Sequence, residues 1–157
     1  MSLIASECRT HPQQGPDEDV DCRATTPESF AIFHERFDFT IDVAASHKNT
    51  KLPRYFSRED NGLTRGWEGE RVWCNPPYSD IRPWVEKALR READIAVLLL
   101  PANRTEQGWW QDLIEPQRHR GDIRVEFIRG RMKFIKHGDS QVFPNNRPPF
   151  GVCLVII

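Results

Sequence analysis

The sequence predicts a single α/β domain with a mostly parallel central sheet and flanking helices. A strand-like run at 72–74, an amphipathic helix pattern at 81–89 and an apolar run at 95–100 follow one another closely. A strand, a helix and a second strand in this order imply a right-handed crossover between parallel strands. The apolar run is typical of a strand that is buried on both faces. The length of 157 residues fits one domain.

Composition and charge argue against several classes of protein. The chain is 38% hydrophobic and 29% charged, and its formal net charge of -1 gives no overall positive field for nucleic acids. Any DNA-binding surface must therefore come from local clusters of basic residues. The four cysteines form no Cys-x-x-Cys pair, which argues against a zinc site and a disulfide framework. This pattern fits a reducing cytosol. The sequence has no signal pattern and no apolar run long enough to span a bilayer.

The first 24 residues predict a flexible tail, and the domain is expected over 25–157. The tail is polar, acidic and proline-bearing. Thr26 and Pro27 then predict a helix start, with Thr26 as the cap and Pro27 in the first turn. This helix is expected to face the core with three regularly spaced aromatic residues, Phe30, Phe33 and Phe37. The Thr-Pro start could also border a cofactor.

A strand at 39–43 carries the first candidate ligand-binding residues. Asp42 lies near its end, and the small residues Ala44 and Ala45 follow. In doubly wound sheets, ligands bind outside the carboxyl ends of the strands. Small side chains let the backbone approach a ligand closely, and an acid there could receive the amino group of a cofactor. The alternative is a carboxylate that only caps a turn, and the chain has no Gly-x-Gly pattern.

A second acid lies in a turn further along the chain. Residues 55–56 are a candidate short strand, and 57–63 predict a turn with Asn-Gly at its tip. Asp60, within this turn, could hold ribose hydroxyls or an adenine amine. It could equally be a solvated turn carboxylate.

The most informative segment is Asn75-Pro76-Pro77-Tyr78, directly after the strand at 72–74. The prolines keep Asn75 and Pro76 extended and offer no main-chain donor. The Asn75 side-chain oxygen and the Pro76 carbonyl can then accept both hydrogens of a planar –NH₂ group. Tyr78 can lie flat against the ring that bears this amine. The nitrogen lone pair is left able to attack a methyl group, so the segment predicts group transfer by placement. The alternative is a proline-rich turn.

The second half of the chain completes the predicted sheet. Its patterns predict a helix that Ser79 or Asp80 caps, with Pro83 in its first turn, and a second helix at 109–114 that ends before Pro116. A strand is expected at 123–128, with a partner strand at 131–135. A polar loop at 136–149 and a closing strand at 150–157 follow.

The order and spacing of these segments resemble one known family. The matching elements are Thr26-Pro27, 39–45, 55–56, 60–63, Trp67, 72–79, 100–102, 109–110 and 130–131. From about residue 26 onwards, the chain resembles the small phage and prophage DNA N6-adenine methyltransferases of the Dam type. The resemblance implies a Rossmann-like (class I) methyltransferase fold, S-adenosylmethionine as the donor and N6 of adenine as the acceptor.

The resemblance also implies roles for individual residues. It places donor contacts at Thr26, Asp42 and Asp60, and target-base contacts at Asn75, Pro76 and Tyr78. Pro27, Ala44 and Ala45 are further candidates for donor contacts, and Asn75 is a candidate for both the donor and the target base. Pro77 is a further candidate within the catalytic segment. Two features of larger adenine methyltransferases are missing, namely a glycine-rich donor loop, replaced here by 43–46, and a separate target-recognition domain.

DNA binding is expected to require base extrusion, because an adenine inside a duplex cannot reach Asn75. Among the basic residues after the site, Arg104, Arg131 and Lys133 are the candidates for phosphate contacts. The alternative is that these charged loops are simply solvated. The sequence leaves the assembly open between a monomer and a homodimer.

Two other functions stay open at this point. Asn-Pro-Pro-Tyr sites also occur in methyltransferases of protein glutamine and RNA guanine. For the DNA adenine-N6 methyltransferase that the resemblance implies, no metal is expected. The absent Gly-x-Gly also permits a catalytically idle protein that binds DNA or the donor.

Overall fold

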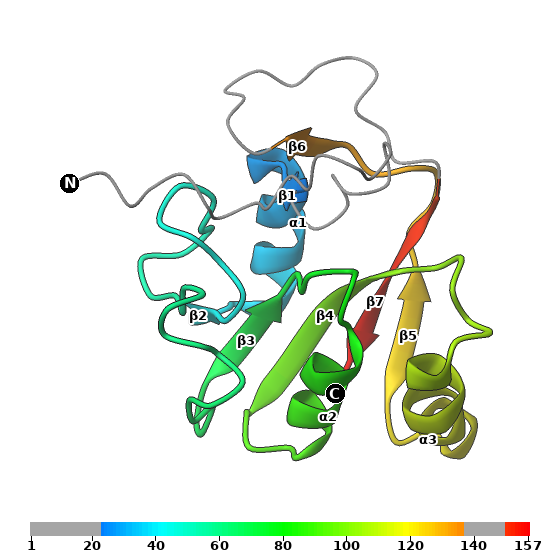
Figure 1. Ribbon diagram of the computed structural model, residues 1–157. Coiled ribbons are helices and arrows are strands. Elements are labelled where there is room, and N and C mark those ends of the chain that lie inside the picture. Colours follow the sequence, from blue (N-terminus) through cyan, green and yellow to red (C-terminus); the bar gives the residue numbers. More distant parts are fainter. Residues whose placement is uncertain (1–22, 137–149) are drawn as a thin grey trace, which may run out of the picture.

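The computed structural model describes residues 23–136 and 150–157, and its centre is a five-stranded sheet (Figure 1). The strands lie in the order β2-β3-β4-β7-β5, and β1 and β6 form a separate two-stranded sheet. The strands are β1 Arg23–Thr25, β2 Ile41–Asp42, β3 Arg71–Cys74, β4 Ile95–Pro101, β5 Arg124–Phe127, β6 Phe134–Lys136 and β7 Val152–Ile156. The helices are α1 Pro27–Phe37, α2 Arg82–Leu89, the π-helix η2 Trp109–Ile114 and α3 Glu115–Arg120.

The predicted β–α–β unit is confirmed. Strands β2, β3 and β4 pair in parallel, and α2 connects β3 to β4. Strand β7 lies antiparallel between β4 and β5, so β5 runs in the direction of β4. Four of the five strands therefore share one direction, which matches the predicted mostly parallel α/β sheet. The carboxyl ends of β2 and β3 consequently meet at one edge of the sheet.

Helix α1 covers one face of this sheet, as its phenylalanine spacing predicts. Thr26 is its N-cap and accepts the Ser29 N–H at 3.2 Å, while Pro27 lies in the first turn. Phe30 and Phe33 pack on Trp73 of β3, with ring centroids 5.4 and 5.7 Å apart. Burying such rings supplies much of the apolar stabilisation of the sheet face.

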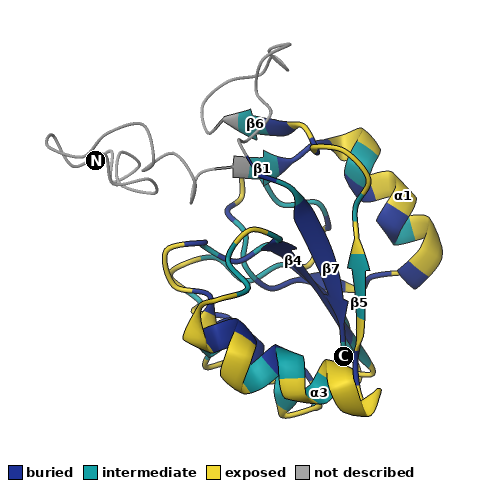
Figure 2. Ribbon diagram, turned by 90° about the vertical axis from the view of Figure 1, so that its right-hand side faces the viewer, coloured by how far each residue is buried: buried dark blue, intermediate teal, exposed yellow. Residues whose placement is uncertain are grey.

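Helix α3 lies away from α1, on the other side of the sheet (Figure 2), and η2 leads directly into it. Arg82 of α2 and Asp112 of η2 form an ion pair at 3.1 Å. The sequence predicts that the helix at 109–114 ends before Pro116. This prediction is wrong, because η2 continues directly into α3. The Glu115 N–H donates to the Trp110 carbonyl, five residues back. Pro116 therefore falls in the first turn of α3, where a missing N–H costs little.

The predicted cap of α2 is also wrong. The helix begins at Arg82 with Ile81 as its N-cap, and it has no side-chain cap. The Asp80 N–H donates to the Pro77 carbonyl at 3.2 Å, so the residues after Tyr78 make a turn before the helix starts.

The predicted pairing of 131–135 with β5 is wrong as well. Strand β6 instead pairs antiparallel with β1, with Ala24 opposite Ile135. Gly130 turns the chain away at a φ of 75°. The side chains of Met132 and Phe134 are then buried, which favours this path over edge pairing with β5.

Arg23 and Ala24, the last two residues of the expected tail, thus belong to a strand, and residues 1–22 lie outside the described residues. Most of the expected loop at 136–149 also lies outside them. Residues 55–56 contribute only an isolated bridge from Tyr55 to Asp42.

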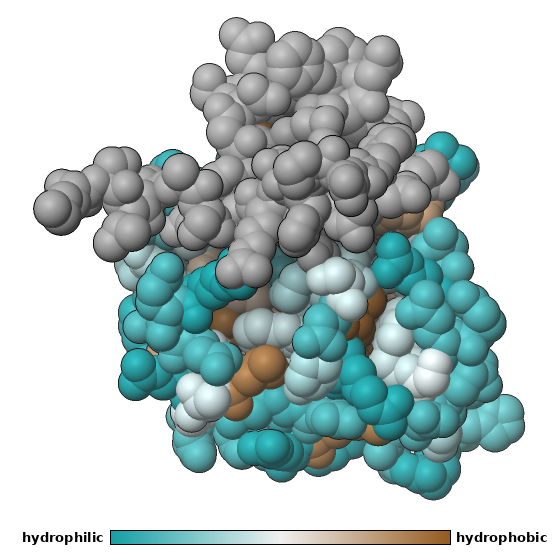
Figure 3. Space-filling model, in the orientation of Figure 1, coloured by the Kyte–Doolittle hydropathy of each residue, from teal (hydrophilic) through white to brown (hydrophobic). Residues whose placement is uncertain are grey.

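The face drawn in Figure 3 is largely hydrophilic, with only small, separated hydrophobic patches. Among the described residues, no helix is long and apolar enough to cross a membrane. Cys74 and Cys153 are buried free thiols, whereas Cys8 and Cys22 lie outside the described residues.

Candidate functional site at the carboxyl edge of the sheet

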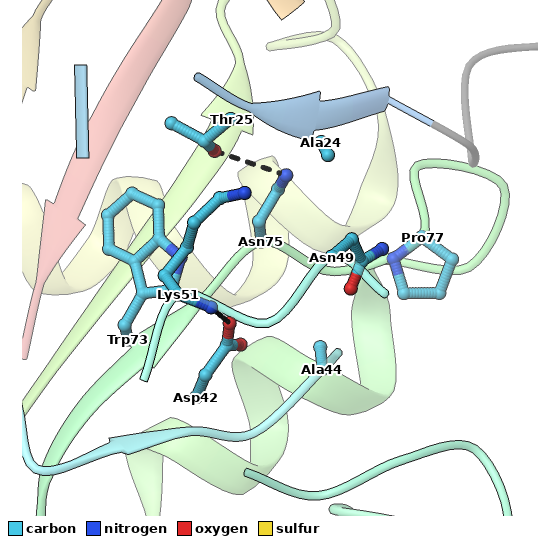
Figure 4. Close-up of a pocket in the computed structure, with 9 residues that line it drawn as sticks. All are labelled: Ala24, Thr25, Asp42, Ala44, Asn49, Lys51, Trp73, Asn75 and Pro77. Atoms are coloured by element: carbon cyan, nitrogen blue, oxygen red, sulfur yellow. Dashed lines mark hydrogen bonds between the residues drawn. The ribbon is translucent and has the colours of Figure 1, made fainter. Parts of the chain in front are cut away.

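A pocket lies where the carboxyl ends of β2 and β3 meet the small β1–β6 sheet (Figure 4). Its free volume, counted together with the open solvent at its mouth, is about 450 Å³. Three chain segments line it: Ala24 and Thr25 of β1; Asp42, Ala44, Asn49 and Lys51 at and after β2; and Trp73, Asn75 and Pro77 at and after β3. The structure thus brings together an acid and an amide that are 33 positions apart in the sequence, Asp42 and Asn75.

Asp42 is a buried carboxylate with an unmet hydrogen-bonding capacity. It is 4% exposed, and its Oδ2 accepts the main-chain N–H of Lys51 at 3.2 Å. Its Oδ1 has no hydrogen-bond partner among residues 23–136 and 150–157. Burial raises the pKa of Asp42 to about 6, although the main-chain N–H groups of Lys51 and Ala44 and the Lys51 charge oppose this. A buried oxygen without a partner is costly unless a ligand supplies a donor.

Lys51 was not predicted as a site residue, yet it lines the pocket beside Asp42. Burial lowers the pKa of its ammonium group, and the Asp42 charge opposes this shift. Sequence patterns gave no signal for it, because it lies in an irregular loop whose path depends on tertiary contacts.

Asn75 and Pro77 also line the pocket, and Pro76 is buried between them. The Asn75 side-chain amide donates from Nδ2 to the Thr25 hydroxyl at 3.4 Å, which joins β1 to the end of β3. This contact orients the amide, so that its oxygen is the end suited to accept hydrogens from a ligand.

Tyr78 departs from its predicted orientation. Its ring is 4% exposed and packs near Phe150, and its hydroxyl donates to the Leu99 carbonyl at 3.0 Å. A buried phenol needs such a partner. The ring therefore points into the core rather than toward the pocket, and it anchors the Pro-Pro turn from within.

Arg104 contacts the same segment from the loop after β4. Its guanidinium donates to the Tyr78 carbonyl at 2.8 Å, and the side chain is partly buried. It thus joins the loops that follow β3 and β4. Arg131 and Lys133, the other predicted phosphate contacts, are exposed between β5 and β6.

The predicted donor contacts at Thr26 and Pro27 lie next to the pocket rather than among its lining residues. The Thr26 hydroxyl is engaged with Ser29 as the helix cap, and the preceding residue, Thr25, lines the pocket instead. The β1–β6 pairing, which the sequence did not reveal, determines which threonine faces the cavity.

Asp60 forms a local turn structure. Its Oδ2 accepts the N–H and the hydroxyl of Ser57, both at 2.9 Å, and these bonds lower the pKa of Asp60. Gly62, two residues later, lies against the Val43 carbonyl so closely that any Cβ would clash at 2.2 Å. The Asp60 turn is therefore fixed beside the end of β2, and Ala44 lines the pocket while Ala45 bonds to Phe56 through its N–H.

Comparison with known proteins identifies the family. The sequence model of the Dam family, described as DNA N-6-adenine-methyltransferase (Dam), matches residues 13–157. The chain belongs to this family. The predicted Dam-type relationship and enzyme class are confirmed. The Dam chain is also 30% identical to the DNA N-6-adenine-methyltransferase of Haemophilus phage HP1 (strain HP1c1) over 136 residues, 83% of this chain and 76% of that protein.

Two further similarities are more limited. The Dam chain is 35% identical to the DNA N-6-adenine-methyltransferase of Escherichia phage T1 over 94 residues, 57% of this chain and 40% of that protein. A solved structure of a protein-(glutamine-N5) methyltransferase (release factor-specific) from Alicyclobacillus acidocaldarius covers 92% of this chain and 98% of its own. The two chains are 17% identical, and their structures superpose with a TM-score of 0.39.

Proposed function

We propose that this Dam-family protein transfers a methyl group from S-adenosylmethionine to N6 of an adenine in DNA. The observation that carries the proposal is the placement of Asn75, at the carboxyl end of β3, in a pocket that also holds the buried carboxylate of Asp42. An amide for the target amine and an acid for the donor thus share one cavity. Family membership supports the choice of adenine in DNA as the acceptor.

The pocket has the chemistry to hold the donor. The Oδ1 of Asp42, which has no partner among the described residues, would accept a hydrogen bond from the donor's ammonium group. Ala44 leaves room beside it, and Asp60 lies in a turn held close to the end of β2. When bound, S-adenosylmethionine supplies a methyl group that is activated by an adjacent sulfonium.

The acceptor contacts come from the Asn-Pro-Pro-Tyr segment. The Asn75 amide oxygen and the Pro76 carbonyl would accept the two N6 hydrogens and direct the nitrogen lone pair at the methyl carbon. The bond from N6 to the methyl carbon forms as the bond from that carbon to sulfur breaks, and the additional N6 proton passes to water. Pro77 and the buried Tyr78 hold this segment rigid rather than stacking on the base.

DNA must present the adenine outside the helix. Extruding a base costs a few kcal/mol, which contacts to the backbone must offset. Arg131 and Lys133 are exposed and suited to phosphate contacts. Arg104 would act mainly by holding the Tyr78 carbonyl in place, with its other donors directed at DNA.

The test is a methyl-transfer assay with a labelled donor and DNA of varied sequence, followed by digestion to nucleosides. N6-methyladenine is the expected product. Asn75→Ala should lower the rate by about 100- to 1000-fold, the loss typical of removing one preorganised hydrogen-bonding group. Its affinity for the donor, measured by calorimetry, should stay close to that of the wild type.

A matched control is Gln117→Ala, which removes another amide on α3, away from the pocket. This variant should keep full activity. Label that appears only in protein or RNA would refute the substrate assignment, and an active Asn75→Ala would refute the site.

A further inference from the structure

We propose that Lys51 binds the carboxylate of the donor's methionine part, while Asp42 binds the neighbouring ammonium group. The inference rests on the proposed function, because it takes S-adenosylmethionine as the ligand of the pocket. It gives the donor site a positively charged contact that sequence motifs did not reveal.

The charges of the pocket match a zwitterion. Asp42 and Lys51 are the charged residues among those that line it, so the lining contributes one negative and one positive group. The α-amino acid end of S-adenosylmethionine carries the same two charges side by side. A phosphate group would meet a single cation beside a buried carboxylate, and the carboxylate would repel it.

The two charged groups are held near each other without neutralising each other. The Lys51 main-chain N–H donates to Asp42 Oδ2 at 3.2 Å, so the loop is tied to the end of β2. The Lys51 side chain extends away from this contact toward Thr25 and Asn75 (Figure 4). Among residues 23–136 and 150–157, the Lys51 ammonium forms no ion pair within 4.0 Å. Both groups are therefore able to contact adjacent groups of one ligand.

The loop that carries Lys51 is preorganised. The Asn49 side-chain oxygen accepts the Ser46 N–H at 2.7 Å, and the Thr50 N–H donates to the Ser46 carbonyl at 2.8 Å. The loop therefore reaches Lys51 in a defined conformation. The ordering cost on ligand binding is therefore largely confined to the Lys51 side chain, because the loop backbone is already fixed.

The partly buried ammonium also gains from a ligand. Burial lowers the pKa of Lys51, which means that its surroundings stabilise the charge poorly. A carboxylate at hydrogen-bond distance would restore that stabilisation. The ammonium group of the ligand would likewise stabilise the buried charge of Asp42. Each charged group of the zwitterion thus pairs with one charged residue of the pocket.

The test compares two ligands and three variants by calorimetry on the full chain. The ligands are S-adenosylmethionine and decarboxylated S-adenosylmethionine, which keeps the sulfonium and the amino group but lacks the carboxylate. The variants are Lys51→Met, Lys51→Arg and, as a matched control, Lys48→Met, which changes an exposed lysine of the same loop. Titrations are run without DNA and with a duplex that contains no adenine, so that no methyl transfer occurs.

Lys51→Met should weaken S-adenosylmethionine binding by about 10- to 100-fold, the range for a charge-assisted hydrogen bond. It should leave the affinity for the decarboxylated ligand within about twofold of the wild type, because the Lys51 ammonium and the ligand carboxylate contribute through one shared interaction. Lys51→Arg should restore part of the loss, and Lys48→Met should change neither affinity.

Three results would overturn the inference. Equal weakening of both ligands by Lys51→Met would show that Lys51 acts through the loop conformation rather than through the carboxylate. Unchanged binding of S-adenosylmethionine would show that Lys51 makes no contact. A wild-type chain that binds neither ligand, with or without DNA, would overturn the proposed donor itself and the inference with it.

Discussion

Asp42 is a buried carboxylate whose ionised form the ligand-free fold stabilises poorly. Its carboxyl is 4% exposed, and burial raises its pKa from 3.8 to about 6. At neutral pH the ionised form is therefore held in a site that favours the neutral form. Residues of this kind are expected where a ligand of opposite charge completes the environment.

The stability of the ligand-free protein should reflect this strain. Because the folded-state pKa of Asp42 lies above its unfolded value, its contribution to stability is most favourable below about pH 4 and is lost as the pH rises through 6. Asp42→Asn should thus stabilise the protein at pH 8 by roughly 2–3 kcal/mol, and by much less at pH 4. Thermal unfolding at both pH values measures this, and a destabilised variant at pH 8 would contradict it.

Donor binding should show the opposite dependence on this residue. Pairing with an ammonium group needs the ionised carboxylate, so wild-type affinity should rise from pH 5 to about pH 7 and then level off. In Asp42→Asn the affinity should be weak and without this rise. Calorimetric titrations across that pH range, at constant ionic strength, provide the measurement.

At the residue scale, the site was predictable where local pattern determines position. Asp42 is the last residue of β2 and Asn75 directly follows β3, and the parallel sheet brings these strand ends together. Thr25 and Lys51 were missed because their place depends on the β1–β6 pairing and on an irregular loop. The Tyr78 ring points into the core instead of lying in the pocket as predicted, since ring direction after Pro-Pro depends on core packing.

At the element scale, variants of Thr26 distinguish its role as the cap of α1 from a role in donor binding. Its hydroxyl caps α1 through Ser29. Thr26→Ala should cost about 1 kcal/mol of stability, seen as a fall of about 2–4 °C in the melting temperature. Thr26→Ser should lose less, because it keeps the hydroxyl.

Donor affinity decides between the two roles of Thr26. If it acts only as the cap, Thr26→Ala should bind S-adenosylmethionine within about twofold of the wild type. A loss of tenfold or more would support the direct donor contact that the family resemblance implies.

Elements with strong periodicity were predicted well, and their ends and pairings less so. The apolar run of β4 and the phenylalanine face of α1 must be buried whatever elements surround them, so the sequence pattern alone identifies them. The passage of η2 into α3 through Pro116 depends on a change of hydrogen-bond register that no local pattern signals. Strand β6 lies opposite β1, more than 100 positions away, and such distant pairings are not visible in one sequence.

At the scale of the whole molecule, DNA binding must work against a net charge of -1. We expect the double variant Arg131→Ala/Lys133→Ala to bind DNA more weakly at low salt. The slope of log affinity against log salt should become less steep by about 1–2, roughly 0.9 for each phosphate contact removed. The control is Arg120→Ala, which removes an exposed guanidinium at the end of α3 that pairs with Asp122. An unchanged slope in the double variant would remove both residues from the DNA surface.

The β1–β6 ribbon has a consequence for how the molecule opens. Two paired strands are barely stable by themselves, and this ribbon is tied to the main sheet at the Thr25–Asn75 contact. Its attachment also depends on the buried side chains of Met132 and Phe134, which detachment would expose to water. Because β1 lines the pocket together with the ends of β2 and β3, a molecule that fills the pocket touches both sheets, and its binding free energy adds to what holds them together.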